Sequence, residues 1–305
     1  MIALEGVSAR RRPLALAAVS LAWEAGAHAI VGGRTDGGPL LLALLAGVAR
    51  PRSGRVRVLD GSPTDPAIRR QVAYVALEPA LPEAMRVGQV LALAAALRGD
   101  EARDPARRLA MLGVDALAER WVASLSREEA RAVALAEAVT SDAVRVVLLE
   151  EPLLSMDARA SGRLPEALRA RARDGRAVVI ATASMRDACD IADDLVAIRG
   201  GRVSPRTACT DALVEAGPEG VELRVVLRDL AAAPALVAAL IGEADVEAVQ
   251  REQGAVYLRG RSATTLARAA GQAALEADVE LAELRIEGAV ATWPRTTPVA
   301  TKDSP

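Results

Sequence analysis

The sequence is poor in the side chains that most often carry chemistry. Its 305 residues include one histidine, His28, two cysteines, Cys189 and Cys209, and one lysine, Lys302. Two cysteines do not make a disulfide framework, and a reducing compartment fits them. Neither cysteine has a histidine nearby to activate it, so we expect both to pack in helices. His28, just before an apolar strand, is expected to have a structural or surface role and not a catalytic one.

Other absences exclude whole classes of protein. The net charge is −2, without a large basic excess, so nothing indicates a nucleic-acid partner. No apolar run reaches the roughly 18 uncharged residues that a transmembrane helix needs. The first residues place a short apolar stretch before their arginines, which is the wrong order for a secretory signal. Together these features predict a cytoplasmic protein.

What the chain does have is a regular alternation of strands and helices. Half of the residues are apolar, and the length suits one large domain and one smaller domain. A continuous apolar strand such as residues 143–149 is typical of a parallel sheet that is covered on both faces. The pattern therefore predicts a doubly wound α/β domain over residues 1–208.

The predicted elements of this domain are as follows. Strands are expected within residues 1–26, most clearly 14–23, and at 27–31, 54–59, 71–76, 143–149, 177–182 and 194–198. Helices are expected at 39–48, 127–139, 159–173 and 185–192, with a helical insertion at 87–98 and 105–120. Asp60-Gly61 predicts a hairpin-like turn, and Ser126 with Glu129 predicts a capping box. Pro165 is expected to kink or shorten its helix.

A different pattern follows residue 208. Strands and helices are predicted at 221–227, 231–241, 246–251, 255–260, 262–275 and 279–286, in the order βαββαβ. That order predicts a small α+β ferredoxin-like domain over residues 218–290. Residues 296–305 are expected to form a flexible tail.

A glycine-rich loop joins the strand at 27–31 to the next helix. It contains Gly32, Gly33, Arg34, Gly37 and Gly38, and is followed by Pro39 and Leu40. Such a strand–loop–helix layout is typical of a phosphate-binding loop, because backbone N–H groups and a helix N-terminus face an anion there. A working loop continues with lysine and then serine or threonine, for the phosphates and for Mg²⁺. Here those places hold glycine and proline, and proline has no N–H.

Five segments in order resemble the ATP-binding subunit of an ABC transporter. They are GGRTDGGPLLLALLAG (32–47), AYVALEP (73–79), LSREEARAVALAEAV (125–139), VVLLEEPLLSMD (146–157) and VVIATASMRDACDIADDLVAIRGGRV (178–203). The resemblance covers residues 1–208 and implies a P-loop NTPase-like domain with a helical insertion. The small C-terminal domain is similar to one found in some ABC-2-type exporter ATPases.

The resemblance also implies where a nucleotide would be bound, and most of those positions are changed. The lysine and magnesium positions are Gly38 and Pro39, and the Q-loop glutamine position is Leu77. The switch histidine position is Ala183. No aromatic residue lies near residues 9–13 to stack on an adenine.

The remaining family positions are kept in part. The signature segment keeps Ser126 but has Arg127 and Glu128 in place of its glycines. A carboxylate there would repel a phosphate. Glu150 stands at the Walker B aspartate position and Glu151 at the catalytic-base position. Asp157 matches the D-loop aspartate.

Three functions stay open at this point, from different classes. The residues favour a degenerate subunit that does not hydrolyse ATP and acts structurally or in regulation within a membrane export complex. No catalytic residue, metal ligand or cofactor is then expected. The alternatives are a diverged but active ATPase powering an ABC-2-type exporter, with ATP and Mg²⁺, and a weak binder of another phosphorylated ligand. Expected partners are a membrane permease and a second ABC ATPase-like subunit, in a homodimer or heterodimer at the inner face of the membrane.

Overall fold

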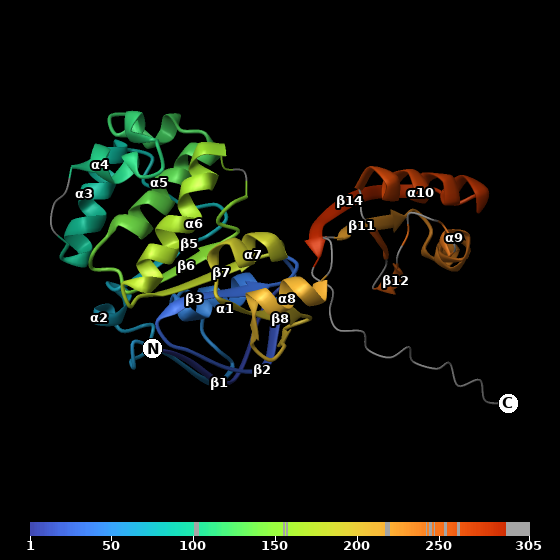
Figure 1. The fold of residues 1–305 in the computed structure, drawn as a ribbon, viewed down its shortest axis with the longest axis horizontal. Helices are drawn as coiled ribbons and strands as arrows, with labels where there is room; N and C mark the ends of the chain where they lie inside the picture. Colours follow the sequence, from blue (N-terminus) through green and yellow to red (C-terminus); the bar gives the residue numbers. More distant parts are fainter. Residues whose placement is uncertain are drawn as a thin grey trace. The chain divides into compact units, whose positions relative to one another are not determined.

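The computed structural model divides the chain into two compact units (Figure 1). One comprises Met1–Thr182 with Arg186–Thr210, and the other Ala183–Met185 with Asp211–Pro305. The structure describes residues 1–100, 104–154, 156, 158–216, 220–241, 243, 246, 248–252, 255–260 and 263–290. Each unit is considered by itself below. None of the helices among these residues is long and apolar enough to cross a membrane.

A mainly parallel sheet forms the centre of the larger unit. Its strand order is β10-β8-β3-β7-β6-β5, in which β8, β3, β7, β6 and β5 run parallel. These strands are β3 (Gly26–Val31), β5 (Val72–Val75), β6 (Val146–Glu150), β7 (Ala177–Thr182) and β8 (Asp194–Arg199). The short strands β9 (Arg202–Val203) and β10 (Thr207–Ala208) pair antiparallel with β8. Every residue of β7 is buried, as expected for a strand covered on both faces.

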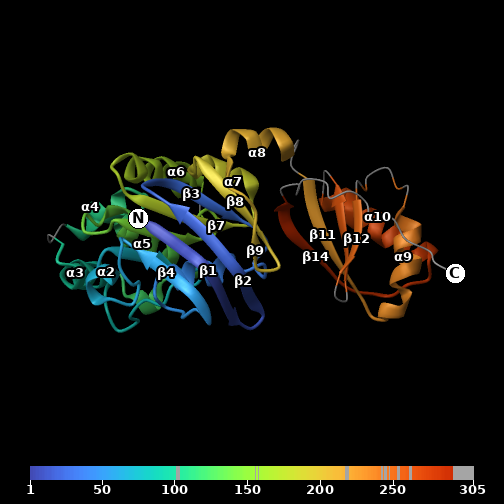
Figure 2. The same ribbon diagram turned by 90° about the horizontal axis from the view of Figure 1, so that it is seen from below.

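Helix α1 (Gly38–Leu45) explains how the two sheets of this unit are joined. Its leucines are buried all round, which is typical of a helix enclosed between layers. It contacts β6 and β7 on one side and the antiparallel sheet β2-β1-β4 on the other. That sheet consists of β1 (Ile2–Arg11), β2 (Leu14–Trp23) and β4 (Ser53–Val58). Figure 2 shows its strands side by side, with α6 (Ala158–Arg173) and α7 (Met185–Ile191) beyond the parallel sheet.

The doubly wound α/β prediction is therefore confirmed, with differences at some elements. The turn at Asp60-Gly61 forms, because Val58 and Gly61 exchange backbone hydrogen bonds. Strand β4 pairs with β1, and after this turn the chain continues into the short helix α2 (Pro66–Arg69). Pro165 does not shorten its helix, because α6 runs through it.

The helical insertion is also less regular than predicted. Helix α3 (Val87–Arg98) matches its predicted range, but α4 ends early, at Pro105–Ala110. Gly113, with φ of 75°, donates to the carbonyl of Ala110 and terminates the helix in a left-handed residue. Two short 3₁₀ turns, η1 (Asp115–Leu117) and η2 (Val122–Ser124), follow before α5 (Arg127–Thr140).

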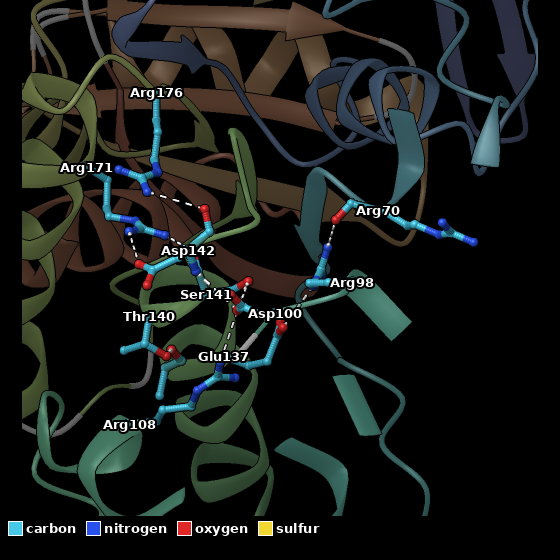
Figure 3. Close-up of polar contacts among 11 residues, drawn as sticks. Arg70, Arg98, Asp100, Arg108, Glu137, Thr140, Ser141, Asp142, Arg171 and Arg176 are labelled. Carbon is cyan, nitrogen blue, oxygen red and sulfur yellow. Dashed lines mark hydrogen bonds and ion pairs between the residues drawn. The ribbon is translucent and has the colours of Figure 1, made fainter. Parts of the chain in front are cut away.

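A buried polar cluster fastens the insertion to the rest of the unit (Figure 3). Asp100 Oδ2, just after α3, accepts hydrogen bonds from Arg108 Nη2 at 3.0 Å and Ser141 Oγ at 2.7 Å. The side chains of Asp100 and Arg108 are only 6% and 3% exposed. Arg98 Nε donates to Glu137 Oε1 at 3.0 Å, and Arg98 Nη1 donates to the carbonyls of Arg70 and Val72. The cluster thus connects α3, α4, α5 and the start of β5.

The smaller unit has the predicted order of elements. It contains β11 (Gly220–Leu227), α9 (Ala233–Leu240), β12 (Ala248–Glu252), β13 (Ala255–Gly260), α10 (Ala263–Glu276) and β14 (Leu281–Val290). The strands form an antiparallel sheet in the order β12-β13-β11-β14, the split βαβ arrangement of a ferredoxin-like domain. Leu223, Val225, Leu236 and Leu266 pack in its core. The predicted tail at 296–305 lies outside the described residues.

We expect Asp100→Asn to lower the free energy of unfolding by about 3 kcal/mol, because it leaves Arg108 as a buried charge without its counter-ion. Urea denaturation measures the loss. Asp174→Asn is the matched control, since its contact with Arg176 is at 3.4 Å but Asp174 is 62% exposed, and an exposed pair contributes about 0–1 kcal/mol. Equal losses in the two variants would contradict the role assigned to the cluster.

The same pair gives a pH dependence with a definite sign. Burial raises the pKa of Asp100, but the Ser141 hydroxyl, the Arg108 charge and two backbone N–H groups outweigh it and lower the pKa. The unfolded chain therefore binds this proton more readily, so stability rises with pH through this range. We expect the stability gap between the wild type and Asp100→Asn to be complete above about pH 5 and to shrink as the pH falls below about 4. A difference in the free energy of unfolding that stays constant down to about pH 2 would contradict this prediction.

Candidate functional site

The glycine-rich loop between β3 and α1 is closed by one of its own side chains. The carboxylate of Asp36 accepts hydrogen bonds from the backbone N–H of Gly33 at 2.9 Å and of Gly200 at 3.0 Å. The backbone of Asp36 pairs with Gly33 and Gly201 as well, with Asp36 N–H donating to Gly33 O and Gly201 N–H donating to Asp36 O, both at 2.9 Å. The Asp36 carboxylate thus binds the N–H of Gly33, a loop N–H that would otherwise be available to a bound anion.

Close packing explains why glycines stand in this loop. A Cβ at Gly32 would lie 2.3 Å from the carbonyl oxygen of Ile198. Gly37 has φ of 113°, and a Cβ there would lie 2.8 Å from the carbonyl oxygen of Ala15. Both positions need glycine for the fold itself, so their presence does not require a phosphate.

The two positions that matter most to a phosphate offer it little. Gly38 is buried beside the apolar side chains of Ile30, Ala181 and Ile198. Pro39 supplies no N–H at the start of α1, although proline is well suited to that position. Leu40 is buried in the core, whereas Arg34 is exposed.

Glu150, at the end of β6, is held by the segment that follows β5. Its Oε1 accepts a hydrogen bond from the Tyr74 hydroxyl, and its Oε2 accepts from the backbone N–H of Leu77 at 3.1 Å. Burial, and then the hydrogen bond to Glu150 and its charge, raise the pKa of Tyr74. The phenol therefore keeps its proton and donates it. Both oxygens of the Glu150 carboxylate therefore have a partner from the chain.

Glu151 is also fixed from within the chain. Its backbone has φ of 43°, an uncommon conformation for a residue with a side chain. Its N–H donates to the carbonyl of Ala181 at 2.7 Å, and its Oε2 accepts from Thr182 Oγ1 at 2.8 Å. Thr182 also accepts from the N–H of Gly32 at 3.1 Å through its carbonyl. The end of β7 therefore joins the catalytic-base position to the glycine-rich loop.

Arg131 is the part of the site that sequence reasoning missed. It lies in α5, is 4% exposed, and donates to the carbonyls of Ala76, Leu77, Glu150 and Glu151. Burial lowers its pKa, while the negative charges of Glu151 and Glu150 act in the opposite direction. The only sequence signal was an arginine within a mostly apolar and small stretch of this helix, five residues after Ser126.

The signature segment satisfies its own helix N-terminus. Ser126 Oγ accepts from the N–H of Glu129 at 3.1 Å, and Glu129 Oε2 accepts from the N–H of Ser126 at 2.8 Å. This confirms the predicted capping box. Glu128 is exposed, and its pKa is lowered by its own backbone N–H and then by the Ser126 hydroxyl. Arg127 lies 3.5 Å from Glu78 in an exposed pair.

Two predicted positions remain, Ala183 and Asp157. Ala183 follows β7 and contributes a methyl group, and Asp157 lies outside the described residues. Among the residues that the structure describes, no three His, Cys, Asp or Glu side chains are grouped to hold a metal ion. His28 Nδ1 lies 3.0 Å from Asp194 Oδ1, and its ring stacks on Trp23.

Comparison with known proteins identifies relatives of the larger unit. Residues 16–154 match the ABC transporter family profile. The molybdenum import ATP-binding protein ModC of Brucella melitensis is 32% identical over 208 residues, which is 65% of this chain and 58% of ModC. The larger unit is therefore similar in sequence to ATP-binding proteins of ABC transporters. The chain thus spans just under three fifths of the curated relative's length.

Solved structures show that the larger unit has the fold of an ABC ATPase domain. A structure described as the ATP-binding subunit of an ABC transporter has a TM-score of 0.62 and 22% identity, over 70% of this chain and 91% of its own. A dimeric ATP-binding cassette, MJ0796, bound to ADP and Pi has a TM-score of 0.61 and 18% identity, over 68% of this chain and 99% of its own. At these identities the likeness concerns the fold. The exporter type that the resemblance implied has no support from ModC, whose name describes import.

We expect Asp36→Ala to lower the free energy of unfolding by about 1–3 kcal/mol, because the N–H groups of Gly33 and Gly200 lose their acceptor. Chemical denaturation measures the change. Asp174→Ala is the control, since Asp174 is 62% exposed and lies 3.4 Å from Arg176. An unchanged stability for Asp36→Ala would show that the carboxylate does not close the loop.

Proposed function

We propose that this chain is a non-hydrolysing ABC-type subunit with a structural or regulatory role in a membrane transport complex. One observation carries the proposal. The groups that would meet a nucleotide are bound to other parts of the chain, namely Asp36 in the loop, Glu150 at the end of β6 and Ser126 at the start of α5.

A triphosphate would meet unfavourable charge in this loop. It would have to displace Asp36 from Gly33 and Gly200, or lie beside its negative charge. Two unit charges 4 Å apart repel by about 4 kcal/mol at an effective dielectric constant of 20. No lysine offsets this repulsion, because the only one in the chain is Lys302.

Magnesium would face a similar competition. At Pro39 it would find no hydroxyl, and at Glu150 it would have to replace the Tyr74 hydroxyl and the Leu77 N–H. A hydrogen bond to a charged group contributes about 1.5–3 kcal/mol to stability. Without a bound nucleotide and its metal, a water deprotonated by Glu151 would have no phosphate to attack.

The proposal includes the partners and place expected of such a subunit. It would bind a membrane permease and pair with another ABC ATPase-like subunit, at the inner face of the membrane. The dimer of MJ0796 is a precedent for such pairing in a protein of the same fold. We leave the direction of transport out of the proposal, because ModC is named for import and the sequence resemblance pointed to export.

A second candidate is an active ATPase. It is favoured by Glu151, which retains a carboxylate at the catalytic-base position with Thr182 as its partner. A third, a weak binder of another phosphorylated ligand, is favoured only by the exposed Arg34 within the loop. The binding experiment below separates all three.

We expect ATP with Mg²⁺ to leave the melting temperature unchanged at nucleotide concentrations up to about 1 mM, since a Kd far above that value gives almost no stabilisation. Hydrolysis should stay at the background rate. Thermal shift and phosphate release measure the two. A shift at micromolar MgATP with turnover would establish the active ATPase, and a shift with inorganic phosphate or a nucleotide without turnover would establish the ligand binder.

We also expect Gly38→Lys with Pro39→Ser to remain without turnover, because Leu77, Glu128 and Ala183 are still in place. Adding Asp36→Ala to the pair should give the first measurable nucleotide binding, since it frees the loop N–H groups. Asp174→Ala added to the same pair is the control. Turnover by the double variant would contradict the proposal that the other positions are defective too.

A further inference from the structure

The two cysteines of the chain lie together, although they are 20 residues apart in sequence. Cys189 belongs to α7, and Cys209 begins α8 (Cys209–Ala216). The thiol of Cys189 donates to the carbonyl oxygen of Cys209 at 3.5 Å. Neither residue belongs to the site described above.

The backbone around the cysteines fixes this approach. Strand β10 pairs with β8 through Thr207 with Leu195 and Ala208 with Asp194. The N–H of Cys209 then donates to the carbonyl of Asp193 at 2.9 Å, just beyond the end of α7. Backbone hydrogen bonds therefore join the segment that carries Cys209 to the segment that follows Cys189. A disulfide requires close Cβ atoms and little strain, and this frame brings the two residues together without a rearrangement of strands.

The two thiols differ in exposure and in acidity. Cys209 is 5% exposed, whereas Cys189 is partly exposed. The hydrogen bond from Cys209 lowers the pKa of Cys189, against the effects of burial and of Asp190. The same hydrogen bond, burial, and the negative charges of Cys189, Asp194 and Asp193 raise the pKa of Cys209. Cys189 is therefore the thiol that reacts first with an oxidant in solution.

We propose that Cys189 and Cys209 form a reversible intramolecular disulfide by exchange with a small disulfide such as oxidised glutathione. The Cys189 thiolate attacks one glutathione sulfur, so a mixed disulfide forms and one glutathione thiolate leaves. Cys209 gives up its proton, attacks the sulfur of Cys189 and releases the second glutathione. One small disulfide is reduced to two thiols, and the two cysteines are oxidised to one disulfide.

Closure of this bond would tie the start of α8 to α7. Helix α7 begins at Met185, two residues after the switch-histidine position Ala183. The oxidised form would thus hold the segment that follows β7 more tightly than the reduced form. This inference does not depend on whether the chain binds a nucleotide.

The test uses the reduced, full-length chain incubated with oxidised glutathione. We expect both titratable thiols to disappear with the loss of two hydrogens in the intact mass. A tryptic digest without reductant should contain residues 187–199 joined to residues 207–224. The melting temperature should rise by roughly 5 °C and return after dithiothreitol, because a cross-link over a loop of this length restricts the unfolded chain. Two stable glutathione adducts, a disulfide between two chains, or no reaction would each overturn the proposal.

Single variants test the assigned order of the two cysteines. Cys209→Ser should accumulate one glutathione on Cys189, because no second thiol resolves it. Cys189→Ser should remain unmodified over the same time, since the remaining thiol is buried. Folding of both variants is checked by comparing their circular dichroism spectra with that of the reduced wild type. A faster adduct on Cys209 than on Cys189 would overturn the mechanism.

Discussion

The arrangement of the candidate site depends on the buried guanidinium of Arg131. It donates to four backbone carbonyls, two in the segment after β5 and two at the end of β6. The carbonyl of Glu151 also accepts from the N–H of Leu154 at 3.1 Å, but a buried carbonyl that has no second donor would lose about 1–3 kcal/mol without Arg131. One side chain of α5 therefore sets the positions of Leu77, Glu150 and Glu151 relative to one another.

With the backbone held in this way, the polar side chains of the site find partners inside the chain. Tyr74 and the N–H of Leu77 bind Glu150, and Thr182 binds Glu151. At the glycine-rich loop, the Asp36 carboxylate likewise finds its donors within the chain, the N–H groups of Gly33 and Gly200. The common physical reason is that a partly buried carboxylate needs hydrogen-bond donors. In this chain the donors that bind these carboxylates come from the protein itself, namely Tyr74, the N–H of Leu77 and Thr182.

Sequence reasoning succeeded where local pattern decides the structure. The apolar runs of β6 and β7 and the capping box of Ser126 and Glu129 were predictable because neighbours in sequence determine them. The end of α4 was missed, since an alanine-rich stretch has helical propensity beyond the glycine that stops it. The turn after β4 was predicted, but not its strand partner, because β1 lies some fifty residues earlier.

The site itself was less predictable, for the same reason of distance. That Gly38, Pro39 and Leu77 lack the required chemistry follows from residue type alone. That Asp36 closes the loop could not be inferred, because one of its donors is Gly200, 164 residues later. Arg131 was missed because an arginine in a helix is usually a solvated residue, and only the fold brings the four carbonyls to it.

The internal contacts also explain why no single change is expected to give a nucleotide site. The contacts of Asp36, Glu150 and Ser126 lie on three different elements, so the costs of opening them add approximately. If each costs about 1–2 kcal/mol, a ligand that needs all three loses about 3–6 kcal/mol, or roughly 10²- to 10⁴-fold in affinity. A lysine at position 38 would add attraction for phosphate but would leave these costs in place. Occupied donors and acceptors therefore weigh against nucleotide binding as much as the missing lysine and hydroxyl do.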